Sequence, residues 1–317
     1  MITISHKSKQ YLLAALKVFI LMVTFSYIYS KLTTSDGLQL ERFTQLLKNR
    51  EGNIFSLVTF LVLALANWFF EILKWKTIVS IIAPLTFTTA MRQSLAALTV
   101  SLATPNRIGD YGAKAMFFQV EKRKQILLLN FFSNSLQMAV TCFFGIIGLM
   151  FVVMEFGISF SITKMMLFLI SIVCLGYLGY YFKEKQLILK GLSVSKVIQY
   201  FRNIARETKL KIFMFSIFRY LIFSYLFYII LLFFGASLPF FEGILIIFSM
   251  YLLVSLIPTI FIFDVLVRGG VAVWLFSMAG VPELVVLSTV LSMWLLNFVG
   301  PAIWGSFYVI TFKPIGK

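Results

Sequence analysis

Nine charged side chains lie inside the long apolar stretches of this sequence, where ionic groups are rare. The nine are Lys17, Glu71, Arg92, Arg107, Asp110, Lys114, Arg219, Asp264 and Arg268. At the centre of a membrane helix each charge costs at least ~2.5–3.5 kcal/mol on insertion scales, so each needs a partner or water. Because six of the nine are bases and three are acids, their surroundings favour an anionic guest.

Most of these charges flank two interruptions of apolar sequence. Residues 84–104 run into Thr104-Pro105-Asn106-Arg107-Ile108-Gly109-Asp110, and residues 241–258 run into Pro258, Asp264 and Arg268-Gly269-Gly270. Each pattern predicts two short helices joined by a broken, charged centre. Irregular backbone at membrane depth is tolerated only where it faces protein or a watery cavity, and helix N-termini there would suit an anion such as phosphate.

We therefore predict one substrate-binding site that the two interruptions share. Its predicted side chains are Glu71, Arg107, Asp110, Lys114, Arg219, Asp264 and Arg268, and its predicted points of close backbone approach are Gly109, Gly112, Gly269 and Gly270. Simpler roles remain open. Asp110 can cap a helix that begins near residue 111, and Lys114 can neutralise Asp110. Glu71 can pair with Lys74 one turn away, or with Arg219.

The composition decides the class of protein. Of 317 residues, 60% are hydrophobic, 17% aromatic and 13% charged, whereas soluble domains carry roughly 25% charged residues. This excludes a soluble globular enzyme, a disordered chain and a disulfide scaffold. The single histidine, His6, and the absence of a CxxC pair argue against metal sites and histidine-based catalysis. We expect no cofactor, no metal and no catalytic activity.

Six stretches approach the ~20 apolar residues that a helix needs to cross a bilayer. They are residues 11–30, 54–75, 126–153, 165–182, 212–234 and 285–310. We predict an all-α polytopic membrane protein with one membrane domain over residues 1–317. It has six spanning helices, and each interrupted stretch forms a re-entrant hairpin. The alternative is that the interrupted stretches also cross, which gives eight or more full spans.

The charges of the loops predict the orientation. The net charge is +16, and the loops on one side carry 17 basic and 3 acidic residues against 5 and 6 on the other. Basic loops remain cytoplasmic, so both termini are predicted to lie inside a plasma (inner) membrane. Membrane topology and anionic lipid explain this charge better than nucleic acid does.

The two interruptions also predict an inverted repeat with halves at residues 11–153 and 165–310. At a constant offset of 154, Val100-Ser101-Leu102 matches Val254-Ser255-Leu256, Asp110 matches Asp264 and Lys114 matches Arg268. An odd number of crossings in the first half forces the second half to run the opposite way. Repeats of this kind with broken helices at matching positions indicate a binding site near the midplane of a transporter.

Three segments resemble the flippase-like family, also described as the lysylphosphatidylglycerol synthase transmembrane-region family. The segments are Thr104-Pro105-Asn106-Arg107-Ile108-Gly109-Asp110-Tyr111-Gly112-Ala113-Lys114, Arg268-Gly269-Gly270-Val271-Ala272-Val273 and residues 294–305. The chain departs from the family in having Asp110 where Glu is common, and Pro258-Thr259-Ile260-Phe261 where many relatives carry a Gly-rich turn. The family's aminoacyl-transferring members carry a soluble domain that this sequence lacks, so the resemblance does not imply synthase activity.

The resemblance implies translocation or handling of a lipid. Together with the charge pattern, it predicts a transporter for a polar or anionic lipid, or for a polyprenyl-phosphate-linked substrate. Two alternatives stay open: a membrane-embedded transferase that uses Asp110 or Asp264 as a base on a lipid phosphate, and a non-transporting assembly partner of a glycosyltransferase. The expected partners are an anionic or polar lipid, the membrane and either a lipid-modifying enzyme or a glycosyltransferase, and no nucleic acid is expected.

Overall fold

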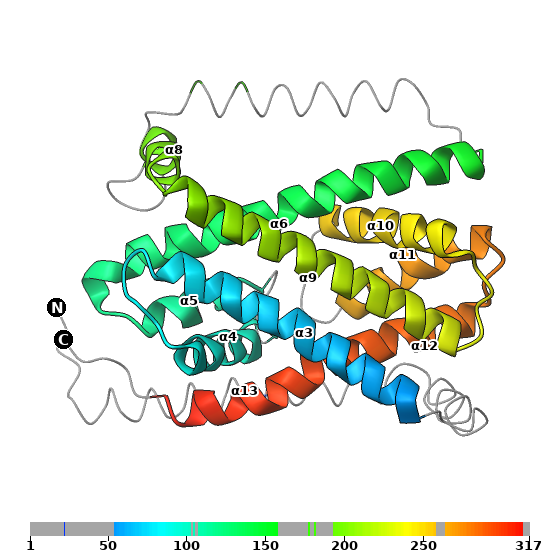
Figure 1. Ribbon diagram of the computed structural model, residues 1–317, viewed down its shortest axis with the longest axis horizontal. Coiled ribbons are helices and arrows are strands. Elements are labelled where there is room, and N and C mark those ends of the chain that lie inside the picture. The colour runs from blue at the N-terminus through cyan, green and yellow to red at the C-terminus, as the bar shows by residue number, and fades with distance from the viewer. Residues whose placement is uncertain are drawn as a thin grey trace.

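The computed structural model describes residues 54–102, 104, 107–157, 193–257 and 264–312, with Met22, Tyr177 and Tyr181. Helices make up nearly all of this part, which confirms the all-α class (Figure 1). The predicted spans at residues 11–30 and 165–182 lie outside the described residues, apart from those isolated positions.

Four helices of the described part are long and apolar enough to cross a membrane. They are α3 (Ile54–Val79), α6 (Val120–Glu155), α9 (Arg206–Phe233) and a composite helix made of α12 (Glu283–Trp294), the π-helical turn η2 (Leu295–Val299) and α13 (Gly300–Ile310). They coincide with four of the six predicted spans. Two of them begin about two turns early, α6 at Val120 and α9 at Arg206, because a helix continues into polar sequence that hydropathy places outside the bilayer.

The two predicted interruptions separate pairs of shorter helices. The first pair is α4 (Phe87–Leu102) and α5 (Gly109–Met116), and the second is α10 (Phe240–Leu256) and α11 (Asp264–Met278). The eight-residue α5 is roughly 12 Å long at 1.5 Å per residue, which is well short of a ~30 Å hydrocarbon core. In Figure 1 the first pair lies in the left half of the molecule and the second pair in the right half.

Helix packing links one half of the chain to the other. α3 packs along α9, α4 packs on α13, and α10 packs on α6. Glycines permit the last two contacts, because a Cβ at Gly305 would collide with the carbonyl oxygen of Leu95, and one at Gly148 with that of Leu245. Small residues that let backbones approach closely are characteristic of helix packing in membranes.

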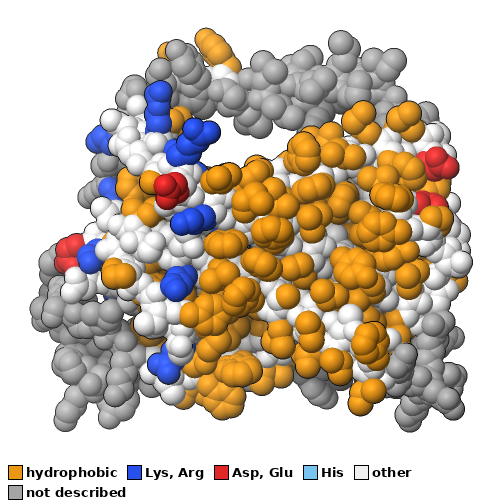
Figure 2. Space-filling view, viewed as in Figure 1, with side chains coloured by type: hydrophobic (Ala, Val, Ile, Leu, Met, Phe, Trp, Pro, Cys, Tyr) orange, Lys and Arg blue, Asp and Glu red, His pale blue; other side chains and the backbone are white. Residues whose placement is uncertain are grey.

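The surface is divided in a way that fits a bilayer. A broad band of hydrophobic side chains covers the middle of the face shown in Figure 2, while lysines and arginines gather at its left end. The short helix α8 (Val194–Arg202) lies at that basic end in Figure 1. Acidic side chains lie at both ends of this face, whereas its right end shows no lysine or arginine. The composition and the four long apolar helices together identify a membrane protein with transmembrane helices.

Candidate anion-binding cavity

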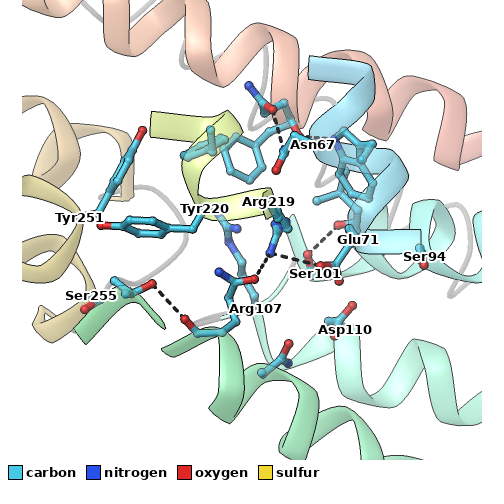
Figure 3. Close-up of a pocket in the computed structure, with 18 of the residues that line it drawn as sticks. Asn67, Glu71, Ser94, Ser101, Arg107, Asp110, Arg219, Tyr220, Tyr251 and Ser255 are labelled. Atoms are coloured by element: carbon cyan, nitrogen blue, oxygen red, sulfur yellow. Dashed lines mark hydrogen bonds and ion pairs between the residues drawn. The ribbon is translucent and has the colours of Figure 1, made fainter. Parts of the chain in front are cut away.

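A cavity of about 410 Å³ opens among the helices of both halves (Figure 3). This volume falls within the range typical of small-molecule sites. Six of the predicted site residues line it: Glu71, Arg107, Asp110, Lys114, Arg219 and Arg268. The structure thus brings together side chains that are nearly 200 positions apart in sequence, from α3, α5, α9 and α11 and from the segment before α5.

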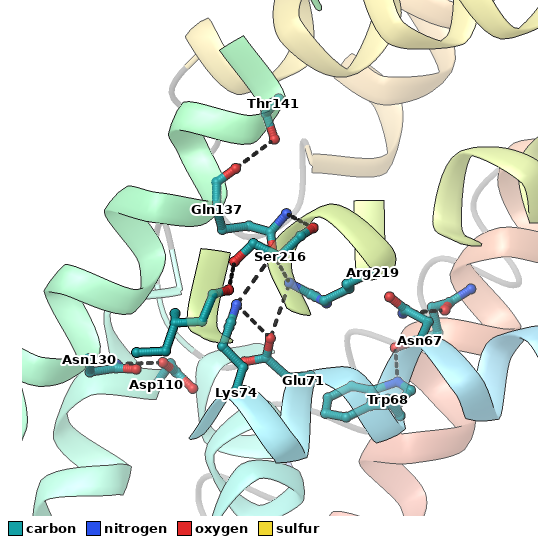
Figure 4. A network of polar contacts seen from close by, with 12 residues as sticks. Asn67, Trp68, Glu71, Lys74, Asp110, Asn130, Gln137, Thr141, Ser216 and Arg219 are labelled. Carbon is teal, nitrogen blue, oxygen red and sulfur yellow. Dashed lines mark hydrogen bonds and ion pairs between the residues drawn. The ribbon is translucent and has the colours of Figure 1, made fainter. Parts of the chain in front are cut away.

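Glu71 of α3 lies at the centre of an ion-pair network (Figure 4). Its Oε2 atom is 2.8 Å from the Nζ of Lys74 and 3.1 Å from an Nη1 of Arg219, and its Oε1 atom is 3.9 Å from the Nζ of Lys114. The pairs with Lys74 and with Arg219 were both open at the level of sequence, and both are present. One carboxylate therefore faces three cations, which leaves an excess of positive charge around it.

A second carboxylate, Asp110, is held by its own partners. Its Oδ1 atom is 3.1 Å from the Nζ of Lys114, so the two side chains neutralise each other as expected from their spacing. The amide of Asn130 donates to Asp110 Oδ2 at 2.7 Å, and Lys114 donates to Asn130 Oδ1 at 3.1 Å. The capping prediction for Asp110 is wrong, because the helix α5 already includes it and the N-cap position is Ile108, which makes no side-chain cap.

The count of loop charges from the sequence placed residues 74–77, and so Lys74, in a cytoplasmic loop, and this assignment is wrong. The helix α3 continues to Val79, and the Lys74 side chain is only 1% exposed. It also donates to the amide oxygen of Gln137 at 3.3 Å, and Arg219 donates to the same oxygen at 3.3 Å. Hydropathy alone could not predict that Lys74 is buried in the protein, because a lysine at a predicted helix end is usually solvated.

Exposure separates the cations into two groups. The side chains of Lys74 and Lys114 are almost fully buried, at 1% and 3% exposed, whereas that of Arg219 is 30% exposed. Arg107 and Arg268 are also partly exposed and line the cavity. These three arginines come from the segment before α5, from α9 and from α11, and they are the cations best placed to meet a ligand.

Arg107 is held in an unusual conformation. Its φ of 55° lies in the left-handed region, which non-glycine residues rarely adopt. Its guanidinium carbon lies 4.4 Å from the centre of the Phe298 ring, on the π-helical turn η2. Strained backbone and π-helical turns both occur preferentially at functional sites. Here they meet on one wall of the cavity.

Uncharged polar groups complete the lining, and these were missed by the sequence analysis. Four buried atoms on uncharged lining residues have no hydrogen-bond partner within the described part of the chain: Asn67 Oδ1, Ser94 Oγ, Tyr220 Oη and Tyr251 Oη. A buried polar group without a partner costs roughly 1–3 kcal/mol, so such groups call for a water or a ligand. In the sequence these groups appear only as polar residues within apolar stretches, a pattern too common to indicate a binding site.

The predicted glycines do not line the cavity. The N–H of Gly109 donates to Thr104 Oγ1 at 2.8 Å, and a Cβ there would lie within 2.8 Å of Val100 O, so Gly109 packs against α4. A Cβ at Gly269 would touch Leu287, while Gly112 and Gly270 face open space. Asp264 begins α11, but its side chain lies outside the described part of the structure.

Across the described residues, no three His, Cys, Asp or Glu side chains are close enough to hold a metal ion. Both carboxylates of the cavity are instead bound to cations of the protein. The arrangement suits an anion that binds the partly exposed arginines and competes with Glu71 for Arg219. No protein-family model matches the chain, and a search of curated proteins finds no match either.

Proposed function

We propose that this protein is a flippase-like transporter that moves an anionic amphiphile across the bilayer, either a polar lipid or a polyprenyl-phosphate-linked substrate. The observation that carries the proposal is the cavity. Among the described residues, four cations and two carboxylates line it, which is a surplus of two positive charges in this part of the lining. The surplus would attract an anionic headgroup, and the unpartnered hydroxyl and amide groups would bind its polar atoms.

The proposal includes an inverted repeat, which the packing supports. In this repeat α3 corresponds to α9, α4 to α10, α5 to α11 and α6 to the composite last helix. The contact of α4 with α13 is then equivalent to the contact of α10 with α6, and both contacts are present. At the predicted offset of 154, α4 ends at Leu102 and α10 at Leu256. Ser101 donates to Leu98 O at 2.7 Å, and Ser255 donates to Leu252 O at the same distance.

The proposal also includes re-entrant hairpins that enter from opposite sides. α5 is too short to cross, and the two helix pairs lie in opposite halves of the molecule. The gathering of basic residues at one end of the surface supports a cytoplasmic location for that end. In this arrangement the cavity lies near the midplane, where a headgroup can be exposed first to one side and then to the other.

The proposed transport cycle has two steps, binding of the headgroup and movement of one half of the protein. The headgroup binds between the two interruptions while the tails remain in lipid, and one half rocks against the other to change the exposed side. The sequence holds no nucleotide-binding motif, so the drive would come from an ion gradient, a substrate gradient or a partner protein. A transferase is less well supported, because Lys114 and Asn130 already bind the carboxylate of Asp110.

Proteoliposomes test the proposal. The assay follows fluorescent phosphatidylglycerol and phosphatidylcholine between leaflets by quenching the outer leaflet with dithionite. Arg107→Ala and Arg268→Ala should each slow transfer of the anionic lipid at least tenfold, whereas Arg206→Ala, an exposed position at the start of α9, should not. Unchanged transfer in both cavity variants would remove the mechanism. A wild-type protein that moves neither lipid but co-purifies with a glycosyltransferase would favour the assembly role.

A further inference from the structure

We infer that Glu71 is a resident counterion, and that the anionic group of the substrate takes its place on Arg219. The inference rests on the proposed function and specifies how the same cavity binds and releases its ligand. It assigns Glu71 a role opposite to that of a binding residue: its carboxylate competes with the substrate for the same guanidinium.

The contacts of Arg219 make it the point of exchange. Its Nη1 atom is shared between Glu71 Oε2, at 3.1 Å, and Gln137 Oε1, at 3.3 Å. Its buried Nε atom has no hydrogen-bond partner among the described residues. A guanidinium offers five donors in a planar fork that fits carboxylate or phosphate with two parallel bonds. Arg219 therefore has donors left for an oxyanion, and it gains the full fork once Glu71 withdraws.

Glu71 can withdraw without leaving its charge unpaired. Lys74 lies 2.8 Å from Oε2 and is almost fully buried, so this partner stays in place. Lys114 lies 3.9 Å from Oε1, at the outer limit of an ion pair, and can approach as Arg219 is released. A buried carboxylate that loses all its partners is strongly unfavourable. Here two cations remain, so the exchange replaces one anion by another on Arg219.

The exchange also explains how a transporter avoids holding its substrate too tightly. Arg219 lines the cavity together with Arg107 and Arg268, and without the competing carboxylate of Glu71 the Arg219 guanidinium would hold a phosphate more tightly. Movement through a membrane requires binding that is favourable enough for entry and weak enough for exit. Competition from Glu71 lowers the affinity, and the return of Glu71 to Arg219 assists release.

The inference predicts an unusual direction for Glu71→Gln. If Glu71 only supported the structure, its loss would weaken ligand binding. If Glu71 is the competing anion, its loss frees Arg219 and tightens binding at least fivefold, while release and therefore transfer between leaflets become slower. The two readings differ in sign, which makes the variant decisive.

The experiment measures the dissociation constants of two probes for the purified full-length chain in neutral detergent micelles. The probes are inorganic phosphate and dioleoylphosphatidylglycerol, and dioleoylphosphatidylcholine serves as the zwitterionic reference. Glu121→Gln, an exposed carboxylate in the first turn of α6, is the matched control. Tighter binding of either anionic probe in Glu71→Gln alone supports the inference. The probe that tightens shows whether free phosphate suffices or the lipid is needed.

A double variant covers the case in which Glu71→Gln does not fold. Glu71→Gln combined with Lys74→Gln removes one charge of each sign, so the cavity keeps its net charge while Arg219 is released. Unchanged or weaker binding in the folded variants would overturn the inference. The proposed function fails separately, when Arg268→Ala binds the anionic probes as tightly as the wild type.

Discussion

The two interrupted helix pairs agree in one structural detail but contribute different chemistry. α4 and α10 end at matching positions with the same serine hydrogen bond, yet the side chains that follow differ. The first pair supplies Asp110 and Lys114, which bind each other and Asn130. The second supplies Arg268 and the buried hydroxyl of Tyr251, which has no hydrogen-bond partner among the described residues. The first interruption adds the partly exposed Arg107, so each pair brings one arginine to the cavity while the other groups differ between the two sides.

The largest expected difference between the two sides is in stability. Lys114→Met removes an almost fully buried cation from its ion pairs with Asp110 and Glu71, so we expect a loss of ~3–5 kcal/mol in the free energy of unfolding. Arg268→Met, at a partly exposed position, should cost no more than about 1 kcal/mol. Thermal unfolding in detergent micelles measures both. Equal losses in the two variants would show that the ion pairs of Lys114 contribute no more to stability than Arg268 does.

The proposed repeat predicts a smaller and symmetric effect on stability. Gly305→Ala and Gly148→Ala each push a Cβ into backbone of the partner helix, so each should cost roughly 1–3 kcal/mol through overpacking. Gly112→Ala is the control, because a Cβ there meets nothing within 4 Å. The same unfolding measurement would contradict the proposed correspondence of halves if one substitution were tolerated and the other were not.

The hydrogen bond between Asn67 and Asn297 should have a moderate effect. The Asn67 amide donates to Asn297 Oδ1 at 2.9 Å, which links α3 to the π-helical turn η2. Interhelical hydrogen bonds in membranes average ~0.6 kcal/mol, with a maximum near 1.7. A double-mutant cycle with Asn67→Leu and Asn297→Leu should return a coupling energy in this range. Strictly additive losses would show that the contact contributes nothing to stability.

The smallest expected effect concerns the paired serines. Ser101→Ala and Ser255→Ala each remove one local side-chain bond to the carbonyl three residues earlier, and such bonds within a helix contribute little. Each should change the free energy of unfolding by less than about 0.5 kcal/mol. We expect the two changes in the free energy of unfolding to agree with each other. A loss above 1 kcal/mol at only one serine would argue against equivalent positions.

The helices were largely predictable from the sequence because hydropathy and turn residues act locally. Apolar runs identified α3, α6, α9 and the composite last helix, and the Pro- and Gly-containing segments identified both interruptions. The π-helical turn at Leu295–Val299 was not predictable. It depends on tertiary contacts of Asn297 and Phe298 with distant residues, which leave no local pattern.

Only the charged residues of the candidate site were predictable from the sequence. Charges are rare in membrane segments, so Glu71, Asp110 and Arg219 were conspicuous, and their pairing follows from geometry. Lys74 was missed because its position near a predicted helix end implied solvent. Tyr220 and Tyr251 were missed because tyrosines are common in apolar helices, and only the fold places their hydroxyls beside one cavity.

The central claim is that a net-positive, water-accessible cavity lies between the two interruptions. Ser255→Cys and Thr141→Cys place a thiol on its lining from each half, in a background where Cys142 and Cys174 are replaced. Anionic and cationic methanethiosulfonate reagents of similar size then report local charge, with the exposed Ser80→Cys as the reference. We predict that both cavity thiols react, and several-fold faster with the anionic reagent. Thiols that do not react, or that prefer the cation, would contradict the account.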